Sequence, residues 1–280
     1  MNKTPFSEAS LQRIARMRLM DDIFMQVTFR MFPECVQEVL RVIMDKPDLL
    51  VVEVRTQEKL PSIAGRSFCL DVLAKDAQSK YYDIEIQRKD DGAHPRRAAS
   101  HASAAEMALA SKGQAAKDAP QLYVIFITEG DVLGDGLPIY HVERTIMETG
   151  RLFGDGVHII YVNGAVQGDA TPLARLMHDL QCADPGAIFN PTLAHAVRHI
   201  KTREEGAKKM GSLSEEIWNE GRAEGRAEGR AEGKAEGLLE GSRRAARQML
   251  AMGGFALEKI AAITSLSEDE VRQLAAAQAY

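Results

Sequence analysis

Residues 81–90 read YYDIEIQRKD, a stretch in which apolar and polar side chains alternate. Successive side chains of a β-strand point to opposite faces, so a strand here has an apolar face and a polar face. The polar face carries Asp83, Glu85 and Gln87. A half-buried antiparallel strand with solvated polar residues is the plain interpretation, and the flanking sequence decides whether the polar face has another use.

The preceding segment 68–76, FCLDVLAKD, is apolar apart from Asp71 until its last two residues. The polar connection 76–80 is short enough for a hairpin. If the turn is centred on Gln78, Asp71 faces Glu85 with Cβ atoms roughly 4.5–5.5 Å apart. Two facing carboxylates repel unless a cation lies between them, and a divalent metal is the obvious candidate. A register shift of one residue would separate the pair.

Asp71 followed by Glu85-Ile86-Gln87 on the next strand resembles the catalytic core of the PD-(D/E)XK nuclease superfamily. More narrowly, it resembles the recombination-promoting nuclease and transposase family, in which Gln often replaces the last Lys. The resemblance extends over most of residues 17–200. It includes LMDDIFMQVTF at 19–29, HPRRAASHA at 94–102, LYVIFITEGDVLGDGLPIY at 122–140 and DGVHIIYVNG at 155–164.

This resemblance implies that Asp71, Glu85 and the backbone carbonyl of Ile86 bind Mg²⁺, with Mn²⁺ as the alternative ion. The metal would activate a water and stabilise charge on the scissile phosphate. Gln87 completes the implied catalytic set, and as a neutral amide it can orient water but supplies no positive charge.

The family's N-terminal acid corresponds to Asp22, which would reach the metal through water, although Asp21 fits the same position. Residue 26, often Lys in relatives, is Gln here. The seven histidines show no ligand spacing on a common face except His195 and His199, four residues apart, and no carboxylate pattern accompanies that pair.

Candidate DNA contacts follow the Glu-x-Gln strand. Arg96 and Arg97 open a helix, where basic side chains oppose the helix dipole, and this favours a role in phosphate contact. Lys89 lies on the polar face if the strand continues, either supplying charge to the site or ending the strand in solvent.

The composition excludes several classes of protein. The formal net charge of −5 and the pI near 5.9 show no overall basicity, although a local basic patch remains compatible with DNA binding. Three cysteines without C-x-x-C spacing are typical of reduced thiols, so we expect a cytoplasmic protein. We expect no signal peptide, because residues 1–20 contain no apolar run long enough for one, and no apolar stretch reaches the length of a membrane span.

The pattern of elements predicts an α/β sandwich. We expect helices over 7–31, 34–45, 95–112 and from Thr171 onward, and strands over 49–54, 68–75, 81–88, 123–128 and 157–162, with a further strand in LPIYHVER and a loop containing Pro61 and Gly65. The resemblance implies a restriction-endonuclease-like core, a mixed sheet flanked by helices, with an α-helical C-terminal extension.

The expected domains are a nuclease-like domain over 1–205, a Gly/Ala/Glu/Arg repeat over 206–245 and a small helical tail over 246–280. The repeat EGRAEGRAEGRAEGKAEGLLEG at 220–241 is either a long helix used in self-association or a flexible charged connector. The first alternative predicts a homodimer or a higher homo-oligomer.

The tail resembles a helix-turn-helix, with a break at Gly253-Gly254 and a capping box formed by Ser267 and Glu270. Its second helix opens with acidic residues, which favours packing or assembly over reading DNA. Two functions follow for the whole chain: a metal-dependent DNA endonuclease, or a nuclease-fold protein that no longer cuts and serves as a DNA-binding or assembly module.

Overall fold

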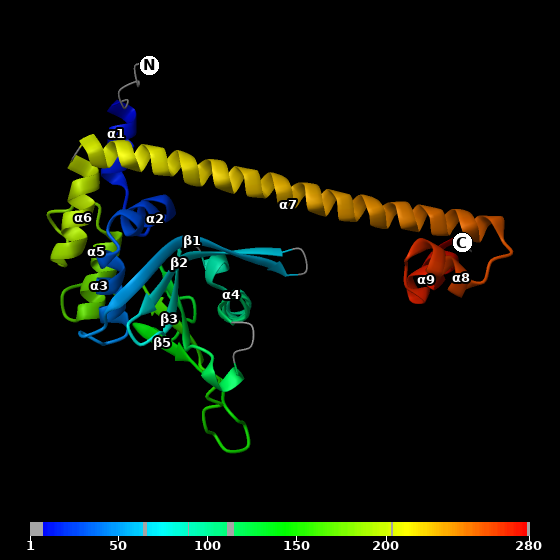
Figure 1. Cartoon of the computed structure of the whole chain (residues 1–280), viewed down its shortest axis with the longest axis horizontal. Helices are drawn as coiled ribbons and strands as arrows, with labels where there is room; N and C mark the ends of the chain where they lie inside the picture. The colour runs from blue at the N-terminus through cyan, green and yellow to red at the C-terminus, as the bar shows by residue number, and fades with distance from the viewer. Residues whose placement is uncertain (1–7, 64–65, 89, 111–114, 203, 279–280) are drawn as a thin grey trace. The chain divides into compact units, whose positions relative to one another are not determined.

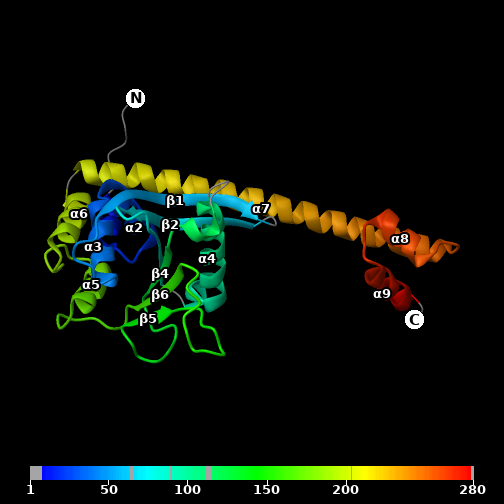
Figure 2. The ribbon, with the colours of Figure 1, turned by 60° about the horizontal axis from the view of Figure 1, so that its bottom comes forward.

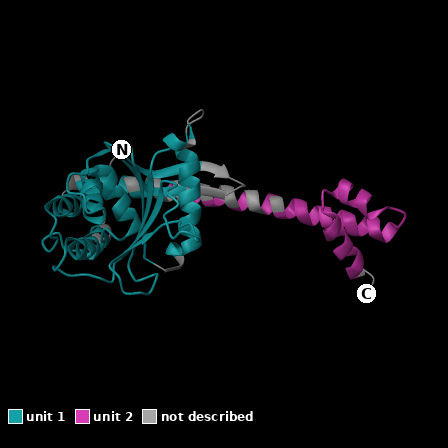
Figure 3. Ribbon diagram, turned by 90° about the horizontal axis from the view of Figure 1, so that it is seen from below, with its two compact units in different colours: residues 1–217 teal, residues 218–280 magenta. Residues whose placement is uncertain are grey.

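The structure is a computed structural model that describes residues 8–63, 66–88, 90–110, 115–202 and 204–278. The chain divides into two compact units, Met1–Ile217 and Trp218–Tyr280, which Figure 3 shows in different colours.

The described part of the first unit contains a mixed six-stranded sheet in the order β1-β2-β3-β4-β6-β5. The pairs β3–β4 and β4–β6 are parallel, and the other neighbours are antiparallel. The strands are β1 (Val51–Ile63), β2 (Arg66–Asp76), β3 (Tyr81–Gln87), β4 (Leu122–Thr128), β5 (Ile139–Val142) and β6 (Val157–Asn163).

Helices cover both faces of this sheet, which confirms the expected α/β sandwich (Figures 1 and 2). One face packs against α2 (Asp22–Met31), α3 (Glu34–Ile43), α5 (Pro172–Gln181) and α6 (Pro191–Thr202). The other face packs against α4 (Pro95–Leu109), which follows the short 3-10 helix η1 (Asp90–Ala93). The remaining elements of this unit are α1 (Glu8–Arg16), η2 (Ala116–Asp118) and the beginning of α7 (Glu204–Met252).

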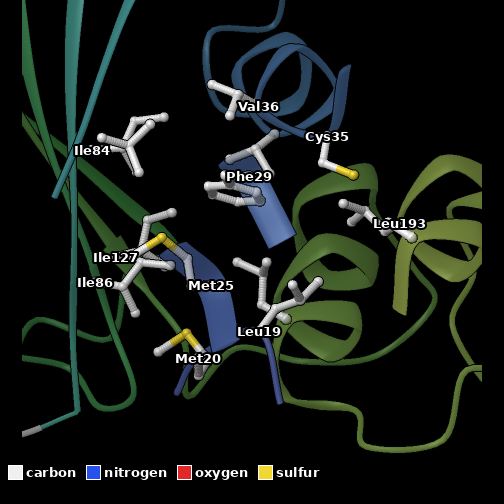
Figure 4. Close-up of a cluster of buried hydrophobic side chains, with 14 of the residues drawn as sticks. Leu19, Met20, Met25, Phe29, Cys35, Val36, Ile84, Ile86, Ile127 and Leu193 are labelled. Atoms are coloured by element: carbon white, nitrogen blue, oxygen red, sulfur yellow. The ribbon is translucent and has the colours of Figure 1, made fainter. Parts of the chain in front are cut away.

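The larger core lies between the sheet and α2, and it takes the apolar side chains of β3. Ile84, Ile86 and the β4 residue Ile127 point toward Met25 and Phe29 of α2 (Figure 4). Because this face is apolar, the alternation along β3 sends its polar side chains to the α4 face.

The predicted helix over 7–31 is wrong in one respect, because the chain leaves the helical path between α1 and α2. Leu19 and Met20 are buried in this break, and the Met20 N–H donates to the carbonyl of Leu180 in α5 at 2.9 Å. The interruption thus inserts two apolar side chains into the core and ties the N-terminal segment to α5.

The prediction of a short strand over 49–54 and a loop through Pro61 is also wrong, because β1 continues to Ile63. A long antiparallel pairing with β2 supplies hydrogen bonds along this length. Proline is tolerated because β1 is an edge strand and its register shifts between Leu60 and Ile63, and edges and bulges are where strands accept proline. Gly65 lies outside the described residues.

The hairpin of β2 and β3 has the expected register. Val72 pairs with Ile84 and Ala74 with Tyr82, so paired positions sum to 156 as they do for a turn centred on Gln78. The Asp76 carboxylate accepts hydrogen bonds from the turn N–H groups of Gln78 and Lys80, which holds the turn and with it the register.

The predicted start of the helix at Thr171 is confirmed. The Thr171 hydroxyl accepts a hydrogen bond from the Ala174 N–H at 3.1 Å and caps α5. Helix α4 ends at Leu109, earlier than expected, and Gly113 lies outside the described residues.

In the second unit, the 220–241 repeat lies within α7, so the helical alternative for this segment is confirmed, whereas its role in self-association stays a prediction. The helix ends before Gly253 and Gly254, which both have positive φ. Its last turns form a small apolar core with α8 (Leu257–Thr264) and α9 (Glu268–Gln278). Ser267 and Glu270 form the expected capping box. No helix among the described residues has the length and apolarity needed to cross a membrane.

Candidate active site

The polar face of β3 is buried beneath α4, so its interpretation as a solvated face is wrong. Asp83 is 0% exposed and Glu85 is 1% exposed. Carboxylates are rarely this buried without a partner, because removing a charge from water costs several kcal/mol. These two residues therefore need an explanation beyond packing.

Asp71 of β2 and Glu85 of β3 lie one position beyond Val72 and Ile84, the last paired residues of the hairpin. The backbone N–H of Asp71 donates to the Glu85 side chain at Oε1, at 2.9 Å, so the two residues are in direct contact. From β1, the amide Nε2 of Gln57 lies 3.5 Å from Asp71 Oδ1. Gln57 has a φ of 55°, a left-handed conformation that is uncommon outside glycine and is often found at functional sites.

The three carboxyl groups on this face favour their neutral forms. Burial, followed by repulsion from Asp22, raises the pKa of Asp71 to about 7. Burial and repulsion from Asp71 and Asp83 raise the pKa of Glu85 to about 9. The pKa of Asp83 is raised well above its ordinary value, first by complete burial and then by Asp71. Negative charge at this site is therefore under-compensated.

An imidazole from α4 completes the cluster. His101 Nδ1 lies 3.7 Å from Asp83 Oδ2 and 3.6 Å from Glu85 Oε1. One ligand atom from each of the three residues lies within 4.8 Å of the others. Burial lowers the pKa of His101, which favours the neutral imidazole that binds metals.

The packing of α4 explains why His101 points at the sheet. Ala98, His101, Ala102 and Ala105 recur at i, i+3, i+4 and i+7, the spacing of one helix face, and all four are buried. The small alanine side chains let the helix approach the sheet closely, mainly over β4 and β6. Sequence reasoning missed Asp83 and His101 as ligands, since their pairing depends on tertiary packing, although this alanine stripe marks His101 as an inward-facing residue.

Of the two N-terminal acids, Asp22 is the one that acts electrostatically on the site. It raises the pKa of Asp71, and its Oδ1 accepts a hydrogen bond from Gln26 Nε2 at 2.6 Å. Asp21 is instead engaged in ion pairs, with Arg88 at 2.9 Å and with Arg18 at 3.8 Å.

These ion pairs form a ring of alternating charge that also includes Glu129, which contacts Arg18 at 2.9 Å and Arg88 at 3.4 Å. The ring joins the segment before α2 to the residues that follow β3 and β4. Its two arginines are neutralised within the ring, so they add little net positive charge to the site.

The basic residues predicted to contact DNA have unequal positions. Arg96 and Arg97 are both exposed in the first turn of α4. Arg97 lowers the pKa of both Asp71 and His101, which places its charge within electrostatic reach of the acidic cluster. Lys89 lies outside the described residues.

Gln87 ends β3 on the same face as Glu85, and its side-chain amide lies so close to Gly92 of η1 that a Cβ added there would overlap it. A backbone hydrogen bond from Ile86 to the Asp71 carboxylate places the main chain of Ile86 beside that acid.

The histidine pair of α6 packs against an aromatic ring. The ring centroids are 5.8 Å apart for His195 and Phe32 and 5.3 Å apart for His199 and Phe32.

The donor set of this site fits a divalent cation. Three carboxyl groups and an imidazole converge, and neither oxygen of Asp83 has a hydrogen-bond donor in the described part of the chain. Carboxylate and imidazole are ordinary ligands of divalent ions, and a bound cation would remove the repulsion that raises the three pKa values.

Comparison with known proteins agrees with this geometry. Residues 36–165 match the family model described as PD-(D/E)XK nuclease family transposase. No curated protein and no solved structure matches the chain significantly. The matched residues run from α3 to just beyond β6 and include the acidic cluster and His101. The mixed sheet between helices is consistent with the fold of that family. Residues 36–165 of this chain are therefore a PD-(D/E)XK nuclease family transposase domain.

Proposed function

We propose that this protein is a metal-dependent DNA endonuclease that hydrolyses phosphodiester bonds. The observation that carries this proposal is the pairing of Asp71 with Glu85 on adjacent strands of a nuclease-family domain. Two carboxylates held together on adjacent strands, with raised pKa values, are the arrangement that a catalytic cation requires.

Asp71, Glu85 and the carbonyl of Ile86 would hold Mg²⁺, or Mn²⁺ in its place, and the bound ion would supply Lewis acidity and an acidified water. Gln87 would orient water through its amide, whose oxygen lies close to Gly92. Asp22, whose charge raises the pKa of Asp71, would reach the metal through water.

Arg97 is the better placed of the two α4 arginines for contact with a phosphate near the cluster, and Arg96 extends the basic surface along the first turn. Phosphate contacts of this kind position DNA without reading its sequence. We assign Lys89 the same role on the strength of its place in the sequence.

Plasmid cleavage in Mg²⁺ tests this proposal. Asp71→Asn and Glu85→Gln keep the size of each side chain and remove its charge, so each should abolish most cleavage, because the members of a metal pair act as a unit. Glu148→Gln changes an exposed acid outside the site and should cut like the unaltered protein. Equal cleavage by all four proteins would mean that these carboxylates are not the catalytic pair.

One feature favours a second function, in which this nuclease-fold protein binds DNA or assembles without cutting. Positions 26 and 87 carry neutral amides, so the acidic cluster receives no lysine from either. Mg²⁺ titration by calorimetry in the presence of DNA separates the two functions, since a scaffold without a working site would not bind this ion.

A further inference from the structure

Asp83 is a buried acid that the proposed cleavage reaction does not use. It is 0% exposed, and neither of its oxygens accepts a hydrogen bond from a donor in the described part of the chain. The neighbouring Glu85 carboxyl can donate to it only when Glu85 itself carries a proton. An isolated buried charge costs several kcal/mol, so Asp83 needs either a shared proton or a cation.

The surroundings of Asp83 are those of a cation site. Its Oδ2 lies 3.7 Å from His101 Nδ1, and Glu85 Oε1 lies 3.6 Å from the same nitrogen. Around an ion with bonds of about 2.1 Å, adjacent ligand atoms are about 3–3.4 Å apart. The two distances from the imidazole to the carboxylates exceed this spacing by only a few tenths of an ångström, and all three ligand atoms lie within 4.8 Å of one another.

This set of ligands is distinct from the pair formed by Asp71 and Glu85. Asp83 precedes Glu85 by two residues on the same strand face, which places it about 6.6–6.8 Å further along β3. Asp83 lies beneath α4, and the third ligand of its set is the imidazole nitrogen of His101. Glu85 stands between the two acids and has two oxygens, so it can serve both positions.

We propose that Asp83, Glu85 and His101 form a second cation site, which binds a divalent transition-metal ion such as Mn²⁺ in preference to Mg²⁺. Imidazole suits transition metals, whereas Mg²⁺ prefers an octahedral set of oxygens and retains its waters. The inference rests on the proposed function only through the shared Glu85.

Mn²⁺ binding to the full-length protein tests the inference without relying on cleavage. Calorimetry should count two Mn²⁺ ions in the unaltered protein and one in Asp83→Asn and in His101→Gln. Electron spin echo measurements on Mn²⁺ should detect an imidazole nitrogen that disappears in His101→Gln. A roughly tenfold or larger excess of Mg²⁺ should leave this nitrogen signal in place.

The matched control is His158→Gln. His158 is also a partly buried histidine beside an acid, with Nδ1 2.6 Å from Glu143 Oε1, but it stacks on Tyr123 and belongs to the opposite face of the sheet. This variant should keep both ions and the nitrogen signal. A signal that survives in His101→Gln, or an unchanged stoichiometry in Asp83→Asn, would overturn the second site.

Thermal denaturation shows whether each variant is folded. It also tests the alternative explanation, in which Asp83 and Glu85 share a proton. In EDTA, Asp83→Asn should melt above the unaltered protein, and Mn²⁺ should raise its Tm less. If Mn²⁺ raises the Tm of both proteins equally, the shared proton is the better explanation.

Failure of this inference and failure of the proposed function are distinguishable. Loss of cleavage in Asp71→Asn together with unchanged Mn²⁺ binding in Asp83→Asn would leave the nuclease and remove the second site. An imidazole signal that depends on His101 in a protein that cuts no DNA would leave the second site and remove the nuclease.

Discussion

One cluster contains three acidic side chains, Asp71, Asp83 and Glu85. Each of them lowers the stability of the metal-free protein. Burial is the largest cause of the raised pKa of every one of them, and their mutual repulsion adds to it. Strongly perturbed carboxyl groups that converge on one point are more typical of a functional site than of a structural one.

The raised pKa values predict that the metal-free protein becomes less stable as the pH rises. The folded state retains protons on Asp71 up to about pH 7 and on Glu85 up to about pH 9, whereas the unfolded chain loses them near the ordinary pKa values of 3.8 and 4.5. Between these limits the folded state binds more protons, so the free energy of unfolding falls with pH, by up to about 1.4 kcal/mol per pH unit for each proton.

Urea denaturation in EDTA between pH 5 and pH 9 measures this slope. Asp83→Asn should flatten it, since removing one acid weakens the repulsion on Glu85. A free energy of unfolding that rises over this range would contradict the assigned burial of the cluster.

Arg97 and Arg96 offer a matched pair for testing the DNA contact. Arg97→Ala should weaken DNA binding several-fold and reduce the slope of log affinity against log salt by about 1, because one phosphate contact is lost. Arg96→Ala should have a smaller effect at the site, since only Arg97 alters the pKa of Asp71. Fluorescence anisotropy of labelled duplex DNA over a range of salt concentrations measures both. Equal losses in the two variants would indicate a general basic surface.

At the scale of elements, α7 contains glycines of two kinds, and this predicts opposite effects of the same substitution. Gly206 is buried, and an added Cβ would collide with the main chain of His199 and Ile200, so Gly206→Ala should destabilise the first unit by about 1–3 kcal/mol. Gly229 is exposed with no heavy atom near an added Cβ, so Gly229→Ala should stabilise the helix by about 1 kcal/mol. Circular dichroism melts of both variants provide the comparison.

The strands and helices show how far the sequence determines this fold. The register of the β2–β3 hairpin follows from the polar turn at Asp76, and the caps at Thr171 and Ser267 follow from local hydrogen bonding. The length of β1 does not follow from its own sequence, because its pairing with β2 overrides the breaker signal of Pro61.

The candidate site likewise contains one contact that follows from local sequence and another that depends on tertiary packing. Asp71 and Glu85 come together through a local hairpin, so their pairing is predictable from 15 residues of sequence. Asp83 and His101 come together only when α4 packs on the sheet, and no local pattern contains that distance. The burial that converts Asp83 from a surface acid into a ligand candidate is likewise a property of the packed layers.

At the scale of the whole molecule, the division of the chain into three parts stays a prediction, and the two compact units guide how it is tested. Ala207 and Met210 are buried in the core of the first unit, although they follow residue 205. A truncated protein should therefore keep α7 as far as Ile217, where the first unit ends. Removal of residues 218–280 then leaves the core of the first unit intact.

Removing residues 218–280 should convert a dimer into a monomer if the repeat mediates assembly. The exposed glycines of the repeat, Gly225, Gly229 and Gly233, have open space around them within the chain, so their roughly 1 kcal/mol cost per residue has no explanation from contacts inside one molecule. Close approach of a helix from a second copy would explain it. Light scattering on the full-length and truncated proteins should give at least two chains and one chain per particle, respectively.

The cleavage products should change with the number of chains per particle. One nuclease site cuts one strand at a time, so a dimer should convert supercoiled plasmid to linear DNA with little nicked intermediate, whereas the truncated monomer should accumulate the nicked form. Full-length protein with Gly225, Gly229 and Gly233 all replaced by alanine is the matched control, because it keeps the helix and alters only the small-residue ridge. A monomeric full-length protein would remove the assembly role and leave the repeat as a helical connector, since nicking by Asp71 and Glu85 needs only the first unit.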